Sequence, residues 1–386
     1  MIIVSLQDAV GAAVGAVSDP ELRRPLAELD MVRDVSVDGA QARIEIALTI
    51  VGCPASDRIE REVRDAAASV DGIDEVEVVL GVMSQAERAA LTERLRGGRT
   101  RTMPFGPDTL TRIIAVTSGK GGVGKSTLTA NLAVALAERG LSVGLIDADV
   151  HGFSIPALLG LTEADGLPPQ PTRIDDLMLP PVAYGVKTIS IGMFLPRDQP
   201  AAAVAWRGPM LHRTVQQFLT DVFFGDLDIL LLDMPPGTGD IAISVGQLLP
   251  HAEVLVVTTP QTAASDVAVR SGLVAGQTGQ RVIGVVENMA AMTLPDGSVL
   301  DLFGSGGGEA VAQALSRAGA AAESIVPLLG SVPLSVGLRR GGDEGVPVVV
   351  RDPDDPAARA IDAVADALVR TAGRRLAGRR LPVTPR

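Results

Sequence analysis

The chain has 386 residues, of which 46% are hydrophobic. That length predicts about two or three domains, and the hydrophobic share argues against a chain dominated by disorder. The formal net charge of −12 repels DNA and anionic membranes, so we expect neither nucleic acid nor a membrane as a partner.

A single cysteine, Cys53, is present. It excludes an internal disulfide framework and a four-thiolate metal site within one chain. No basic region precedes the apolar residues 9–17, so the N-terminus does not resemble a secretory signal and we expect a cytoplasmic protein.

Residues 1–95 are predicted to form a small α/β domain. Two strands are expected to form a hairpin across Asp38-Gly39, a favoured tight-turn pair. The predicted elements are helix, strand, strand, helix and strand, over residues 6–17, 32–37, 42–50, 56–70 and 75–80.

Residues 96–111, which contain Gly, Pro and polar residues, are predicted to be a linker. Between residues 112 and 370, short apolar runs alternate with helical segments, which predicts a mostly parallel sheet covered by helices on both faces. Residues 165–185 are expected to be rich in loops, and residues 371–386 to form a basic tail that frays or binds an acidic partner. The predicted strands lie at residues 112–117, 142–146, 187–191, 228–232, 253–258 and 281–286.

Residues 119–126 match the phosphate-binding pattern G-x-x-x-x-G-K-[ST] between a predicted strand and a predicted helix. Glycines let backbone N–H groups approach phosphates, and the helix N-terminus adds partial positive charge. We expect Lys125 to reach the β- and γ-phosphates of a nucleotide and the Ser126 hydroxyl to ligate Mg²⁺. The residues predicted to bind the nucleotide through this loop are Gly119, Lys120, Gly121, Gly122, Val123, Gly124, Lys125, Ser126 and Thr127.

Three aspartates follow predicted strands. Asp233 ends the apolar run 228–232, where a carboxylate can hold Mg²⁺ through a water. Asp147 and Asp149 flank one residue, so in extended structure their carboxylates point to the same side. Such a pair can bind metal-ligated water or orient the attacking water, and the sequence does not divide these tasks between the two.

Lysine occurs only three times among 34 Lys and Arg residues, and two of the three are in this loop. That usage indicates a role for a compact ammonium group. Lys120 resembles the additional lysine of the deviant Walker A ATPases, the class that includes MinD, ParA and the nitrogenase iron protein. In that class the lysine reaches across a nucleotide-sandwich dimer to the partner's phosphates. The resemblance implies a homodimer with ATP at its interface, and ATP hydrolysis coupled to a change in how the subunits associate. The predicted catalytic lysines are Lys120 and Lys125.

Further motifs are similar to those of the Mrp/ApbC proteins, which carry iron–sulfur clusters to apoproteins. The matching segments are Trp206-Arg-Gly-Pro-Met210, Asp233-Met-Pro-Pro-Gly-Thr-Gly-Asp240, Phe303-Gly-Ser-Gly-Gly-Gly308 and Val332-Pro333-Leu334, with Asp19-Pro20-Glu21 and Thr49-Ile-Val-Gly-Cys53-Pro54 in the N-terminal domain. Related N-terminal domains occur in iron–sulfur assembly factors.

The resemblance to the Mrp/ApbC proteins covers nearly the whole chain up to residue 370. It implies that apoproteins accept clusters from this chain and that Asn288 contacts adenine. It also implies that Asp149 positions the attacking water. From the residues themselves, the predicted Mg²⁺ ligands are Ser126, Asp147 and Asp233.

One feature of that family is missing. Many members carry Cys-x-x-Cys shortly after a Glu-Asn-Met segment, so that a dimer supplies four thiolates to one cluster. Here Glu287-Asn288-Met289 is followed by Ala-Ala-Met-Thr-Leu-Pro-Asp-Gly, and a dimer has two thiols in total. A four-thiolate cluster therefore needs ligands from elsewhere. Cys53 carries the remaining cluster hypothesis because a helix N-terminus after it would lower its pKa; a buried structural cysteine is the alternative.

Two other functions remain open. A positioning ATPase of the MinD or ParA type would need a membrane-binding helix or a basic DNA-binding face. Asp362 and Asp366 in the C-terminal helical segment, and the net charge of −12, argue against both. An ATP-driven assembly scaffold would recruit a partner through residues 1–95 and hold no cluster, and Cys53→Ser would leave its function intact.

Overall fold

The computed structural model describes residues 5–50, 52–96, 103–150, 152–195, 208–294, 296–318 and 325–376. It divides into two compact units. The first consists of residues 1–102 together with 171–182 and 221–225, and the second of residues 103–170, 183–220 and 226–386.

The first unit contains a three-stranded sheet in the order β1-β2-β3. β1 and β2 are antiparallel, as the predicted hairpin requires, whereas β2 and β3 are parallel. Ile44 and Ile46 of β2 are fully buried in its core. The last helix of this unit is not among the predicted elements, because it is mostly polar and buries only Leu91, Thr92 and Leu95. The elements are α1 (Leu6–Gly15), β1 (Val32–Asp38), β2 (Gln41–Leu48), α2 (Ser56–Ala68), β3 (Glu75–Val82) and α3 (Gln85–Arg96).

A short hairpin later in the chain also belongs to the first unit. β6 (Thr172–Ile174) pairs antiparallel with β7 (Leu177–Leu179). Its apolar side chains are buried in the same core as Ile44 and Ile46. The segment predicted to be rich in loops therefore contains two paired strands that complete the core of the N-terminal unit.

The second unit is built on an eight-stranded sheet in the order β15-β12-β11-β4-β10-β5-β9-β8. All the pairings from β15 to β9 are parallel, which confirms the predicted fold class. Its strands are β4 (Arg112–Ser118), β5 (Val143–Asp147), β8 (Val182–Ala183), β9 (Val186–Ser190), β10 (Ile229–Asp233), β11 (Glu253–Thr258), β12 (Arg281–Ala290) and β15 (Leu328–Pro333). The helices are α4 (Lys125–Glu138), α5 (Ile155–Leu158), α6 (Gly208–Asp221), α7 (Asp240–Leu248), α8 (Thr262–Gln277), α9 (Gly307–Ala318), α10 (Val336–Glu344), α11 (Val348–Arg351) and α12 (Pro356–Leu376).

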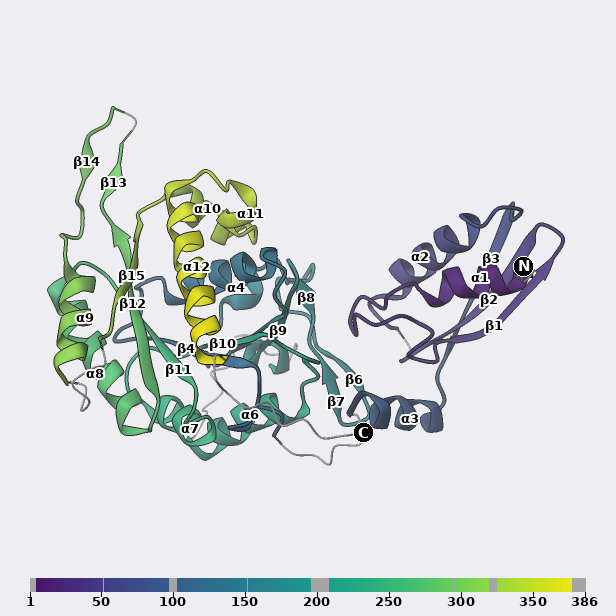
Figure 1. Ribbon diagram of the computed structural model, residues 1–386, viewed down its shortest axis with the longest axis horizontal. Coiled ribbons are helices and arrows are strands. Elements are labelled where there is room, and N and C mark those ends of the chain that lie inside the picture. The colour runs from purple at the N-terminus through teal and green to yellow at the C-terminus, as the bar shows by residue number, and fades with distance from the viewer. Residues whose placement is uncertain are drawn as a thin grey trace. The chain divides into compact units, whose positions relative to one another are not determined.

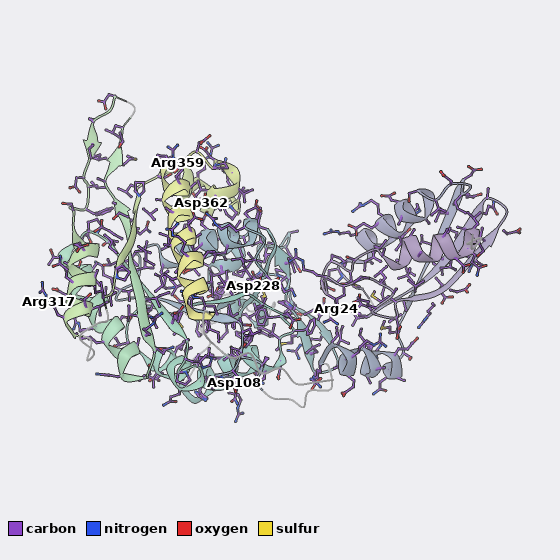
Figure 2. All side chains as sticks on the ribbon, in the orientation of Figure 1. Arg24, Asp108, Asp228, Arg317, Arg359 and Asp362 are labelled. Atoms are coloured by element: carbon purple, nitrogen blue, oxygen red, sulfur yellow. The ribbon has the colours of Figure 1, made fainter. Side chains whose placement is uncertain are left out.

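Helices cover both faces of this sheet: α4 packs with α12 on one face, and α7, α8 and α9 follow one another on the other (Figure 1). Arg139 at the end of α4 anchors α12, because its guanidinium donates to Asp362 at 2.9 Å and to Asp366 at 2.8 Å (Asp362 is labelled in Figure 2). α12 continues through Leu376, so the first residues of the predicted tail are helical, and residues 377–386 lie outside the described part. None of the described helices is long and apolar enough to cross a membrane.

Candidate functional site

The residues between β4 and α4 form a loop at the carboxyl edge of the second unit's sheet. β4 ends at Ser118 and α4 begins at Lys125, so the strand, loop and helix occur in the predicted order. Gly122 and Gly124 have φ values of +81° and +77°, which favour glycine. The loop borders a cavity of about 510 Å³, lined by Ser118, residues 120–127, Asp149, Gly152, Pro235 and Pro236.

Asp233, at the end of β10, is the acceptor on which the loop's polar groups converge. It accepts the Lys125 ammonium at 2.7 Å and the Ser126 hydroxyl at 2.6 Å. Thr129 also donates to it, at 3.0 Å. Thr129 was not predicted as a site residue, although its place one helical turn after Lys125 puts it on the same face of α4. The structure thus brings Lys125 and Ser126 into contact with Asp233, which follows them by more than 100 residues in the sequence.

Asp147 lies beside Asp233, because β5 and β10 are paired with these two residues in register. It accepts the Ser190 hydroxyl at 3.0 Å and two backbone amides. Burial and the neighbouring Asp233 charge raise the pKa of Asp147 to about 8. Burial also raises the pKa of Asp233, and the Lys125 ammonium opposes that rise. Two buried carboxylates side by side favour a bound cation, which would stabilise their charged forms.

Mg²⁺ fits this set of donors. Mg²⁺ prefers hard oxygen ligands and is commonly held by one or two carboxylates together with substrate phosphates. Ser126, Asp147 and Asp233 supply a hydroxyl and two carboxylates. Among the residues that the structure describes, no group of three or more His, Cys, Asp and Glu side chains is placed to hold a metal. Phosphate oxygens or water would complete the coordination of a metal held by these donors.

Asp149 differs from Asp147 in its surroundings. Asp149 lines the cavity, and its carboxylate accepts the Gly152 amide at 3.1 Å. Asp147 does not line the cavity and is fully buried. The expectation that both carboxylates point to one side assumed an extended chain, but β5 ends at Asp147. His151, between these residues and α5, lies outside the described part.

Lys120 and Asn288, two predicted nucleotide-binding residues, differ in their exposure to solvent. Lys120 is exposed at the cavity. Asn288, at the end of β12, is buried, and its side-chain amide donates to the Val123 carbonyl at 2.9 Å. A Cβ added to Gly124 would lie 2.3 Å from that amide nitrogen. Asn288 therefore supports the loop directly, a contact that the sequence did not predict, and its contact with adenine stays a prediction.

Cys53 lies in the first unit, 4% exposed. Its thiol donates to the Glu21 carboxylate at 3.8 Å, and Thr172 of β6 donates to the same carboxylate at 2.6 Å. Burial raises the pKa of Cys53 to about 11, and the Glu21 and Asp19 charges add to the rise. A hydrogen bond with the Ala55 backbone opposes the rise but does not offset the effect of burial, so the expected lowering of the thiol pKa is wrong for this structure.

A four-thiolate cluster does not fit the residues of this chain. Cys53 is its single cysteine, and the thiol form dominates at neutral pH when the pKa is about 11. The residues after Met289 form a small hairpin of β13 (Met292–Thr293) and β14 (Val299–Leu300) that extends from the end of β12 (Figure 1).

Comparison with known proteins agrees with this geometry. Residues 109–369 match the model of the NUBPL iron-transfer P-loop NTPases. The chain belongs to this family. Residues 7–79 match the model of an iron–sulfur cluster assembly protein, so the N-terminal and ATPase-like parts each resemble the proteins expected from the motifs.

Relatives align with nearly the whole chain. The iron–sulfur cluster carrier protein of Mycobacterium tuberculosis (strain ATCC 25618 / H37Rv) is 53% identical over 384 residues, covering 98% of this chain and 97% of that protein. The protein of the same name from Synechocystis sp. (strain PCC 6803) is 41% identical, covering 93% and 95%. MinD of Pyrococcus horikoshii OT3, solved with Mg-ADP, has a TM-score of 0.50 and 25% identity, covering 68% of this chain and 98% of that chain. The fold and the family are therefore those of a P-loop NTPase.

Proposed function

We propose that this NTPase binds and hydrolyses Mg·ATP and uses the cycle to deliver iron–sulfur clusters to apoproteins. The convergence of Lys125, Ser126 and Thr129 on the buried Asp233 carries the ATPase part of the proposal. The names of the relatives support the delivery part. In this proposal a positioning function of the MinD or ParA type is the weaker alternative, because the relatives of highest identity described above are named as carriers.

The residues have distinct roles in this proposal. Lys125 exchanges its contact with Asp233 for the β- and γ-phosphates, and the backbone amides of residues 119–127 hold the phosphate oxygens. Ser126, Asp147 and Asp233 hold Mg²⁺, which neutralises phosphate charge when bound. Asp149, which lines the cavity, orients the attacking water. Asn288 contacts adenine while it supports the loop.

We further propose that ATP is bound at a homodimer interface. Lys120 supports this arrangement because its ammonium is exposed at the cavity and free to reach the phosphates held by a second subunit. Phosphate release with Mg²⁺ or with EDTA tests hydrolysis, and light scattering with ATP or ADP tests the dimer. Hydrolysis that is unaffected by EDTA would contradict the metal site.

A second candidate function is an ATP-driven assembly scaffold that holds no cluster. The observation that favours it is the burial of Cys53, which raises the pKa of its thiol. As a carrier, the chain would use Cys53 as a cluster ligand, together with ligands from a partner. In either case the N-terminal unit, which contains residues 1–95 and the β6–β7 hairpin, would recruit the partner protein.

Anaerobic reconstitution with iron and sulfide separates the two. Absorption spectra and iron content are measured on the wild type and on Cys53→Ser, with Glu28→Gln as a control that changes an exposed residue of the same unit. A stoichiometric cluster that Cys53→Ser loses supports the carrier. Iron at background in both proteins, with ATP still hydrolysed, supports the scaffold.

A further inference from the structure

Helix α8 lies directly against the phosphate-binding loop. A Cβ added to Gly119 would lie 2.3 Å from the Ala268 nitrogen and 2.3 Å from the Val267 carbonyl carbon, so the loop backbone approaches the helix more closely than any side chain would allow. Gly119 does not itself line the cavity. Residues on this face of α8 can therefore affect the site without contacting the nucleotide.

Ser271 is the polar residue of this face that connects the strand below the loop with the loop after Asp233. Its hydroxyl oxygen lies 2.8 Å from the Thr117 hydroxyl oxygen and 3.5 Å from the Gly237 carbonyl oxygen. Ser271 is 4% exposed and Thr117 is 5% exposed. Both hydroxyls are thus shielded from bulk water, and their contacts are with the protein.

The direction of the Thr117–Ser271 hydrogen bond depends on where the single proton of the Ser271 hydroxyl points. A hydroxyl donates one proton, and a carbonyl oxygen only accepts. When Ser271 donates to Gly237, its contact with Thr117 requires Thr117 to be the donor. In that arrangement Thr117 donates to Ser271, and Ser271 donates to the Gly237 carbonyl.

Gly237 belongs to residues 234–239, which connect Asp233 with α7. Pro235 and Pro236 of the same segment line the cavity. The Gly237 amide donates to the Ser118 carbonyl at 2.8 Å, so both polar groups of this residue contact the strand or helix behind the loop. The 3.5 Å separation is longer than the usual ~2.5–3.0 Å of an O–H···O hydrogen bond, so a small shift of the segment toward Ser271 strengthens the contact and a small shift away breaks it.

We propose that Ser271 is a positioning residue for ATP hydrolysis: it holds the Gly237 carbonyl and so fixes residues 234–239 beside the phosphates. This inference rests on the proposed ATPase function. Ser271 contacts neither the cavity nor the predicted metal ligands. Its hydroxyl therefore affects hydrolysis by holding residues 234–239 in position during the chemical step. Binding of the nucleotide to residues 119–127 does not depend on it.

The test compares Ser271→Ala with Ser265→Ala in the full chain. Ser265 is a buried serine of the same helix whose hydroxyl donates instead to the Gly307 carbonyl at 3.2 Å. Loss of one hydrogen bond predicts that Ser271→Ala lowers kcat about fivefold. KM and the Kd for a fluorescent ADP analogue stay within about twofold. Ser265→Ala keeps the wild-type kcat, and Ser271→Thr, which retains the hydroxyl, restores most of it.

Thr117→Val provides an independent variant of nearly equal shape. It removes the donor to Ser271, so its effect on kcat is smaller than that of Ser271→Ala, and the double variant is no slower than Ser271→Ala alone. Melting temperatures are measured on every variant. A kcat for Ser271→Ala within twofold of the wild type, an equal loss in Ser265→Ala, or a double variant with additive losses would overturn the inference.

The two proposals fail in different ways. If the wild type releases no phosphate from Mg·ATP above background, the ATPase function is refuted, and the role of Ser271 falls with it. If the wild type hydrolyses ATP and Ser271→Ala does so equally well, only the role of Ser271 is refuted.

Discussion

The phosphate-binding loop and the surroundings of Cys53 both contain buried carboxylates, but they use them differently. At the loop, Asp233 is matched by the Lys125 ammonium and two hydroxyl donors. Around Cys53, the Glu21 and Asp19 charges add to the effect of burial and keep the thiol protonated. The first arrangement can exchange its internal partners for a phosphate and a metal ion, whereas the second disfavours the thiolate that a metal requires.

Lys125→Ala is the most severe test of the phosphate-binding loop. We expect at least a ~100-fold loss of ATP hydrolysis, because preorganised charges of this kind contribute on that scale. Phosphate release is the measurement, and Arg359→Ala, which removes an exposed guanidinium from α12, is the control. Activity within tenfold of the wild type would remove Lys125 from the site.

Gly119→Ala tests whether close packing on α8 holds the loop in place. The added Cβ would meet backbone atoms that cannot move away, so we expect the free energy of unfolding to fall by about 1–3 kcal/mol. Gly121→Ala is the matched control, since its Cβ would meet only Pro236 at 3.8 Å. Denaturant unfolding without nucleotide measures both, and equal stabilities would show that the loop adjusts.

Lys120→Ala separates the two lysines of the loop. If Lys120 acts from the second subunit, hydrolysis falls about tenfold, the scale of one charge-assisted hydrogen bond, while first binding of nucleotide is impaired less. Hydrolysis, nucleotide affinity and ATP-dependent dimer formation are measured together. A loss of affinity as large as the loss of hydrolysis would place Lys120 on its own subunit's nucleotide.

Glu21→Gln tests how the carboxylates around Cys53 affect its thiol. Removing the carboxylate charge beside Cys53 lowers the thiol pKa from about 11, so the thiolate fraction at pH 9 rises. We expect alkylation of this single cysteine to become about two- to threefold faster at that pH. Glu28→Gln is the control, and an unchanged pH profile would mean that burial alone sets the pKa.

The two regions also differ in how far the sequence could describe them. The loop motif lies within residues 119–126, so the sequence predicted which residues form the loop between strand and helix. Asp233 was predicted as well, because the carboxyl ends of neighbouring parallel strands meet at one edge of a sheet. The contacts of Thr129, Asn288 and Ser271 needed the packing of α4, β12 and α8, and the sequence analysis did not find them.

By itself the sequence determined the fold class, the phosphate-binding loop and the absence of four thiolates, since each follows from residue types, their order and their periodicity. Only the tertiary structure decided that the β6–β7 hairpin completes the N-terminal core and that Thr172 contacts Glu21 beside Cys53. It also decided that burial and neighbouring carboxylates raise the pKa of the Cys53 thiol. These properties depend on burial and on charges from distant parts of the chain, which a pattern along one segment does not contain.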